Sequence, residues 1–99
     1  MAVVLRFAPT GMTEAIYSEC LSRLEAAGAG SPPGRLYHVC FGDKSNLRVS
    51  DIWDTRENFE AFSKTLRPIM EELGIAGEPE FLEVHNTIEG VRSAATTAG

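Results

Sequence analysis

The sequence lacks the features that mark several large protein classes. No apolar run approaches the ~20 residues that a membrane-spanning helix needs, and residues 1–5 carry neither the basic region nor the apolar core of a secretory signal. Serine-nucleophile motifs, phosphate-binding loops, dinucleotide fingerprints and local metal motifs such as HExxH are also missing. We therefore expect no bound cofactor and no membrane partner.

Basic residues are scarce as well. The chain has 9 Lys and Arg against 14 Asp and Glu, which gives a net charge of −5. An acidic balance argues against a nucleic-acid groove, because binding to phosphate backbones depends on clustered positive charge. We expect no nucleic-acid partner.

Cysteine is rare, with only Cys20 and Cys40 present. Their spacing matches no CxxC zinc or redox motif, and a short secreted disulfide scaffold usually carries more cysteines. Both lie inside apolar patterns, which favours buried free thiols over a disulfide or a nucleophile. This usage predicts a cytoplasmic protein.

The remaining composition is that of one soluble globular domain. The chain has 99 residues, of which 43% are hydrophobic and 23% charged. A domain of this size buries only about two thirds of the surface that its unfolded chain exposes. Association with a second copy is therefore an expectation from size alone.

Alternating apolar residues predict four strands. Gly42 is followed by turn residues, and if Asp43–Asn46 form a four-residue hairpin loop, then His38 faces Asp51 across the hairpin. The four segments with a period of two are Ala2–Phe7, Arg35–Phe41, Leu47–Trp53 and Phe81–Ile88.

Two amphipathic helices separate these strands. Thr13 is the expected N-cap of the first, and Gly28 the glycine that follows its end. Thr55 is the expected N-cap of the second, whose apolar stripe contains Pro68 and should therefore be kinked or split. We assign residues 1–89 to the folded domain and residues 90–99 to a mobile tail.

The order βαββαβ predicts an α+β, ferredoxin-like fold with a four-stranded antiparallel sheet. Right-handed crossovers give the strand order 4-1-3-2, with two helices on one face. The most apolar choice for the helix-facing side is Val3, Leu5, Phe7, Tyr37, Val39, Phe41, Ile52, Leu82, Val84 and Ile88. The opposite side then carries Val4, Arg6, Leu36, His38, Cys40, Val49, Asp51, Trp53, Phe81, Glu83 and His85.

This opposite side mixes large apolar residues with histidines, an arginine and carboxylates. Left in water it would form an unusually large apolar patch. Packing against the same face of a second copy would bury the apolar residues and enclose the ionisable ones around a cavity. We therefore predict a homodimer through the open sheet face, with a cavity for a small-molecule ligand in each subunit.

The segment Trp53–Phe62, read WDTRENFEAF, resembles the strand-to-helix junction of the dimeric α/β-barrel superfamily, which includes the antibiotic-biosynthesis-monooxygenase-like proteins. Leu66-Arg67-Pro68 and Arg35–Val39 are also similar to small uncharacterised members, and the likeness covers nearly all of residues 2–88. The resemblance implies a dimeric α/β barrel formed by sheet-to-sheet packing. It also implies either cofactor-independent oxygenation of phenolic compounds, haem degradation or another small-molecule reaction.

Only part of the functional pattern of that superfamily carries over. Trp53 corresponds to a tryptophan of the functional sets, whereas Arg6 stands where the haem-degrading pattern has an asparagine. The second predicted helix contains no histidine, the residue type that binds haem iron in that pattern. The resemblance therefore favours a monooxygenase-like enzyme over a haem-degrading one.

His38 and Asp51 are the leading candidates for proton transfer. A carboxylate beside an imidazole orients the ring and strengthens it as a general base. Arg6 and His85 would then stabilise the resulting anion. The alternative for His38 and Asp51 is a satisfied pair that only specifies strand register, and Arg6 could equally pair with Glu83 or Asp51 across the dimer interface.

The same face supplies candidates for binding. Trp53 and Phe81 are aromatic walls suited to a planar substrate. His38 and His85 with Asp51 or Glu83 could hold a metal, but they share no local ligand motif, and we assign none. The other predicted substrate contacts are Leu36, Val49 and Glu83.

Two other functions remain open from the sequence. One is a non-catalytic ligand-binding or stress-associated dimer, in which the polar cavity groups pair with one another. The other is an interaction module that uses the acidic helix face. Saturable binding without turnover distinguishes the first from an enzyme, and salt-sensitive partners are expected for the second.

Overall fold

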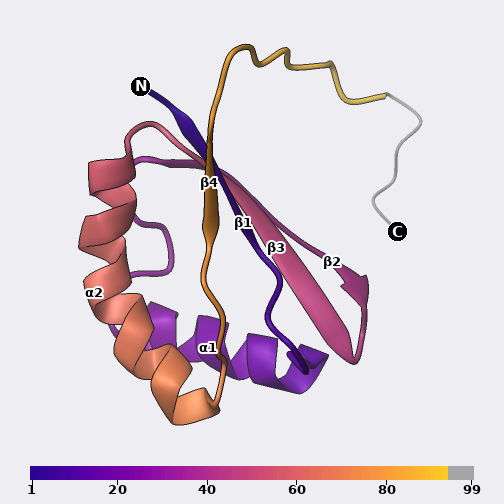
Figure 1. The fold of residues 1–99 in the computed structure, drawn as a ribbon, viewed down its shortest axis with the longest axis vertical. Helices are drawn as coiled ribbons and strands as arrows, with labels where there is room; N and C mark the ends of the chain where they lie inside the picture. The colour runs from indigo at the N-terminus through magenta and orange to yellow at the C-terminus, as the bar shows by residue number, and fades with distance from the viewer. Residues whose placement is uncertain (94–99) are drawn as a thin grey trace.

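The computed structural model describes residues 1–93 and has the element order βαββαβ. The four strands form one antiparallel sheet in the order β2-β3-β1-β4, and both helices cover the same side of it (Figure 1). This confirms the predicted α+β, ferredoxin-like fold and its strand order. The elements are β1 (Val3–Phe7), α1 (Glu14–Ala26), β2 (Arg35–Asp43), β3 (Asn46–Trp53), α2 (Arg56–Leu73) and β4 (Glu80–Glu83).

Both helices begin at the predicted caps. The hydroxyl oxygens of Thr13 and Thr55 accept hydrogen bonds from backbone N–H groups three residues ahead, each at 3.2 Å. Gly28 follows the end of α1 with a φ of 77°, a conformation that glycine adopts without steric cost. Local sequence chemistry alone therefore sets where each helix starts.

Pro68 does not split the second helix. α2 runs from Arg56 to Leu73 as one element with Pro68 inside it, so the predicted break does not occur. Proline removes only one backbone hydrogen bond. Phe62 and Ile69 are buried on either side of it, and their packing holds the helix together across that gap.

The last strand is shorter than its sequence pattern predicts. β4 ends at Glu83 rather than Ile88, and the N–H of Val84 makes the final ladder contact by donating to the carbonyl of Ala2. The neighbouring strand β1 begins at Val3, so later residues have no backbone to pair with. Residues 84–93 leave the sheet as an irregular segment (Figure 1). Most of the tail predicted from residue 90 lies outside the described residues.

The sheet faces are assigned differently from the sequence prediction. Val3 lies opposite Trp53, and Leu5 lies opposite Asp51. Directly opposed residues in an antiparallel pair share a face, so Trp53 and Asp51 lie with the apolar residues of β1 toward the helices. In β2, β3 and β4 the residues predicted to face the helices therefore face away from them, and the residues predicted for the open face lie on the helix side. The helix-facing positions are Val3, Leu5, Phe7, His38, Cys40, Leu47, Val49, Asp51, Trp53, Phe81 and Glu83.

On the open face, strands β2, β3 and β4 present the residues that the sequence prediction had placed against the helices, whereas β1 presents Val4 and Arg6 as predicted. One row across all four strands is apolar, consisting of Tyr37, Ile52, Val4 and Leu82. Tyr37 is 58% exposed and Leu82 43% exposed. The adjacent row, made of Val39, Ser50, Arg6 and Glu80, is polar at three of its four positions. The open face is thus an apolar band with a charged rim.

The core is centred on Trp53, whose side chain is 0% exposed. Its ring packs against Phe59 and Phe62 of α2, with centroids 5.5 and 5.4 Å away. Phe81 extends this cluster through an edge contact with Phe59 at 5.3 Å. Aromatic pairs of this kind contribute about 0.5–1.5 kcal/mol each beyond the area that they bury.

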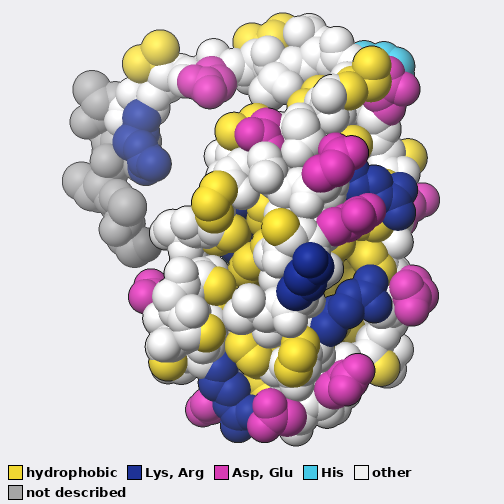
Figure 2. Space-filling model, turned by 90° about the vertical axis from the view of Figure 1, so that its left-hand side faces the viewer, with side chains coloured by type: hydrophobic (Ala, Val, Ile, Leu, Met, Phe, Trp, Pro, Cys, Tyr) yellow, Lys and Arg dark blue, Asp and Glu magenta, His cyan; other side chains and the backbone are white. Residues whose placement is uncertain are grey.

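The exposed side of α2 carries interspersed acidic and basic side chains with apolar atoms between them (Figure 2). No charge of one sign dominates this view. Within residues 1–93, no helix has the length and apolar character required to cross a membrane.

Candidate functional site

The β2–β3 hairpin brings His38 and Asp51 into direct contact. The two residues are cross-strand partners, as predicted. The predicted four-residue loop is shorter, because Asp43 pairs with Asn46 and leaves only Lys44 and Ser45 between the strands, but the register is the same. The imidazole Nδ1 lies 2.5 Å from Asp51 Oδ1. The second carboxylate oxygen of Asp51 accepts a hydrogen bond from Trp53 Nε1–H at 3.2 Å. Asp51 is only 6% exposed, so its position is set by two fixed partners rather than by solvent.

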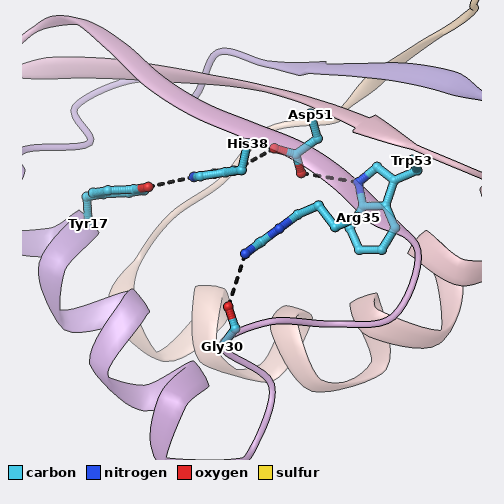
Figure 3. Close-up of polar contacts among 6 residues, drawn as sticks. All are labelled: Tyr17, Gly30, Arg35, His38, Asp51 and Trp53. Carbon is cyan, nitrogen blue, oxygen red and sulfur yellow. Dashed lines mark hydrogen bonds and ion pairs between the residues drawn. The ribbon is translucent and has the colours of Figure 1, made fainter. Parts of the chain in front are cut away.

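Tyr17 of α1 completes this chain of polar groups. Its hydroxyl lies 2.6 Å from His38 Nε2, and the two rings are nearly parallel, with an interplanar angle of 7°. Figure 3 shows the unbroken line from Tyr17 through His38 and Asp51 to Trp53. We call Tyr17, His38 and Asp51 the relay.

The direction of the hydrogen bonds follows from the chemistry of Tyr17. Burial, with a smaller contribution from the nearby Cys40 thiol, raises the pKa of Tyr17 to about 12. The phenol therefore keeps its proton at neutral pH and donates it to His38 Nε2. Nδ1 then carries the ring proton and donates to the Asp51 carboxylate. In this tautomer Nε2 is the nitrogen that accepts from Tyr17.

A cavity of about 140 Å³ lies beside the relay, between the sheet and the two helices. All three relay residues line it, together with Arg35. Its walls are otherwise mostly apolar and include Leu5, Phe7, Phe59, Phe62, Leu66 and Met70. An apolar cavity with a few convergent polar groups is the usual form of a small-molecule site.

Arg35 brings a positive charge to the edge of this cavity. Its guanidinium donates to the carbonyl of Gly30 at 3.0 Å (Figure 3). It also lies 5.8 Å from the centroid of the Phe62 ring. The charge of Arg35 acts to lower the pKa of Tyr17, in opposition to burial. No ion pair to Arg35 forms within the part of the chain that the structure describes.

Several predicted site residues come together here. His38 and Asp51 form the centre of the relay, and Val49 lines the cavity. Trp53 lies behind the cavity wall and reaches the site through its hydrogen bond to Asp51. These residues lie on the helix side of the sheet, not on the open face where the sequence prediction had placed them, because β3 has the opposite phase.

Two other candidates lie apart from this group. Arg6 is on the open face and lies 3.8 Å from Glu80 of its own chain, whereas Glu83 and Asp51 are at helix-facing positions. His85 is exposed beyond the end of β4. Arg6 and His85 therefore cannot stabilise an anion in this cavity.

The remaining predicted binding residues also lie outside the cavity lining. Leu36 is 64% exposed at the irregularity where the β2–β3 register shifts. Glu83 is exposed on the edge strand β4. Phe81 faces the helices but packs against Phe59, with the Arg56 guanidinium 4.0 Å from its ring centroid.

The sequence analysis missed Tyr17, Arg35, Phe59 and Phe62 as site residues. Tyr17 belongs to the apolar stripe of the first helix, and a hydroxyl-bearing residue in such a stripe needs a polar partner across the interface. The strand Asn46–Trp53 also held a usable signal. Leu47, Val49 and Trp53 alternate with Arg48 and Ser50, which favours the phase that turns Asp51 toward the helices.

The two cysteines are free thiols, as predicted. Cys20 is buried and Cys40 is half-buried, and in both cases burial raises the pKa of the thiol. A raised thiol pKa lowers the fraction of reactive thiolate at neutral pH. Among residues 1–93, no three His, Cys, Asp or Glu side chains cluster in a way that could hold a metal ion.

The sequence matches no protein-family model and no curated protein. The structure, in contrast, is similar to several solved ones. A proposed antibiotic biosynthesis monooxygenase from Chloroflexus aurantiacus J-10-fl superposes with a TM-score of 0.60 at 19% identity, over 89% of this chain and 95% of that one.

SnoaB, a cofactor-independent oxygenase from Streptomyces nogalater, gives a TM-score of 0.58 at 22% identity, over 90% of this chain and 96% of that one. A conserved protein from Methanosarcina mazei Go1 gives 0.61 at 12% identity, over 83% and 89% of the two chains. The chain therefore has the α+β, ferredoxin-like fold of antibiotic-biosynthesis-monooxygenase-like proteins.

Proposed function

We propose that this protein is a cofactor-independent, monooxygenase-like enzyme that binds a phenolic or enolisable small molecule in the cavity beside the relay. The observation that carries the proposal is the hydrogen-bonded chain from Tyr17 Oη through the His38 ring to the Asp51 carboxylate, lining that cavity. Such a chain is a means of accepting a proton from a bound substrate.

The first step is proton transfer. A substrate hydroxyl that donates to Tyr17 Oη gives its proton to that oxygen, while the Tyr17 proton moves to His38 Nε2. The resulting imidazolium is stabilised by Asp51, which is itself held by Trp53 Nε1–H. A positioned general base of this kind contributes roughly 100–10,000-fold to the rate.

The second step uses molecular oxygen. The deprotonated ring is electron-rich and adds O₂ at a ring carbon to form a hydroperoxide. Loss of water then leaves one oxygen atom on the substrate. With hydroquinone, one O₂ is consumed, and the products are a hydroxyquinone and one water, so that the substrate itself supplies the electrons.

The comparisons support this reading at the level of fold. SnoaB is named as a cofactor-independent oxygenase, and its structure covers nearly the same extent as this chain. The same scaffold therefore accommodates an oxygenase reaction in another protein. The assignment to this chain depends on its own relay and cavity.

Oxygen consumption with a panel of hydroquinone-like compounds tests the proposal. We expect at least one compound to be oxidised by the parent protein, and His38→Ala to lower the rate on it by about 100-fold or more. His85→Ala is the matched control, because this histidine is exposed and outside the cavity. Equal rates for His38→Ala and the parent would show that His38 is not the base.

A non-catalytic ligand-binding protein is the second candidate. One observation favours it: within residues 1–93, every buried side-chain nitrogen and oxygen has a hydrogen-bond partner, so the relay is satisfied without any ligand. On this alternative, the panel compounds bind with saturation but no oxygen is consumed. That result would replace the enzymatic proposal.

We also propose that the protein is a homodimer through the open sheet face. The apolar row of Tyr37, Ile52, Val4 and Leu82 supports this, because such a band is costly to leave in water. A second copy offers the same band, and opposed sheets pack about 10 Å apart with interdigitated side chains. The two free thiols support a cytoplasmic location, where thiols remain reduced.

A further inference from the structure

The volume of the cavity limits the size of its ligand. The space beside the relay is about 140 Å³. An engineered apolar cavity of about 150 Å³ in another protein binds benzene. This space therefore matches a single aromatic ring, and a fused second ring exceeds it.

The deep walls cannot easily yield to a larger ligand. Leu5, Leu24, Phe59 and Phe62 line the cavity and also belong to the buried core of the domain. Forcing extra atoms into a packed core costs about 1–3 kcal/mol. The outer lining is different, because Arg67 and Glu78 there are exposed and charged. A second ring would have to displace the core or lie among these charged groups.

The polar part of the cavity fixes how such a ring is oriented. The relay lines one part of the wall, while much of the remaining lining is apolar. A hydroxyl group directed at Tyr17 Oη therefore leaves the ring against the phenylalanines of α2. We propose that, given the function proposed above, the cavity takes a single-ring phenol with its hydroxyl at Tyr17 and excludes fused-ring phenols.

Calorimetric titration with phenol, 2-naphthol and 9-phenanthrol tests the size limit without requiring turnover. If apolar contact alone decides binding, affinity rises with each ring because more apolar surface is buried. If the cavity limits size, we expect affinity to fall by about tenfold from phenol to 2-naphthol, and further for 9-phenanthrol. Equal or rising affinity across the series would overturn the proposal, as would a failure of phenol to bind.

Cavity variants provide an independent test. Leu66→Ala and Leu21→Ala both remove carbon atoms from the lining, and Leu21 is already 38% exposed, so its variant should fold. We expect each to restore 2-naphthol affinity to near that of phenol. Leu82→Ala is the matched control on the open face and should leave the order of affinities unchanged. The size limit would be contradicted if Leu82→Ala also restored the affinity for 2-naphthol. It would equally be contradicted if neither cavity variant restored that affinity.

Turnover separates this inference from the proposed function. If phenol binds most tightly but hydroquinone consumes no oxygen, the enzymatic proposal fails and the size limit stands. If 1,4-dihydroxynaphthalene consumes oxygen faster than hydroquinone, the size limit fails and the oxygenase proposal stands.

Discussion

At the residue scale, the site depends on how one imidazole is held. His38 receives a hydrogen bond from Tyr17 at Nε2 and donates one to Asp51 from Nδ1. Neutral imidazole has one donor and one acceptor nitrogen, and this arrangement uses each once. In this tautomer Nε2 is the atom that can take up the Tyr17 proton.

Spectrophotometric titration checks the state of Tyr17. The chain contains two tyrosines, so Tyr37→Phe leaves Tyr17 as the only one that ionises. We expect its transition near pH 12, because burial raises the pKa of Tyr17 to about 12. A midpoint near pH 10, the ordinary value, would contradict the buried donor.

The same shift makes stability depend on pH. Between about pH 10 and pH 12 the folded protein keeps the Tyr17 proton, while the unfolded chain has lost it. The contribution of Tyr17 to stability is therefore complete below about pH 10 and decreases as pH rises toward 12. Urea denaturation from pH 9 to pH 11.5 should show a smaller loss of stability in Tyr17→Phe than in the parent. Identical slopes would argue against this linkage.

Asp51→Asn tests the other end of the relay. An amide presents one oxygen and one NH₂, so it cannot accept from both His38 and Trp53 through separate oxygens as the carboxylate does. We expect a loss of about 1–3 kcal/mol in the free energy of unfolding, measured by denaturant titration, because a buried donor is left unpaired. Asp54→Asn, at an exposed position, is the control and should cost much less. Equal losses in the two variants would mean that the buried hydrogen bonds of Asp51 contribute little to the free energy of unfolding.

At the scale of elements, the loop before β2 approaches the start of α2 very closely. The N–H of Asp54 donates to the carbonyl of Gly34 at 2.9 Å. A Cβ atom at position 34 would lie 2.5 Å from Asp54 Oδ1 and 2.6 Å from Asn58 Nδ2. This contact joins the entry of β2, and hence Arg35, to the junction between β3 and α2.

Gly34→Ala and Gly28→Ala together isolate that contact. Both glycines have positive φ values, 88° and 77°, so alanine costs roughly 1–2 kcal/mol at either position. Gly28 has open space around its missing Cβ, whereas Gly34 does not. We expect Gly34→Ala to lower the free energy of unfolding by clearly more than Gly28→Ala. If thermal denaturation gives the same loss for both, the close approach has no energetic consequence.

At the scale of the whole molecule, the two sides of the sheet have different roles. The helix side holds the core and the cavity, and the open side presents an apolar row that ends beside charged residues. The proposed dimer covers the open side. Because the cavity lies on the other side of the sheet, each subunit contains a complete relay.

Ile52→Glu tests the proposed dimer. Ile52 lies in the apolar row on β3, an inner strand of the sheet. A charge buried at this interface without a partner costs several kcal/mol, so we expect the variant to sediment as a monomer where the parent sediments as a dimer. Ala61→Glu adds the same charge on the exposed surface of α2 and should remain dimeric. A monomeric parent at micromolar concentration would overturn the interface.

The sequence by itself determined the elements, their order and one contact of the site. Caps at Thr13 and Thr55 and the turn after Gly42 act over a few residues, so they could be read directly. The position of that turn placed His38 opposite Asp51. These are local effects, because hydrogen bonds at helix starts and in short turns depend on near neighbours.

Only the tertiary structure decided which side of the sheet faces the helices. Both sides of β2 carry apolar residues, so its alternation fits either phase. The choice is made through its partner β3, which pairs on its other side with β1, more than 40 positions away in sequence. That pairing turned Asp51 and Trp53 inward, brought Tyr17 onto His38, and left Arg6 and His85 outside. Local chemistry fits both phases of these strands equally well, and only long-range packing between strands and helices selects one. The selected phase places the relay residues on the helix side, where the cavity lies.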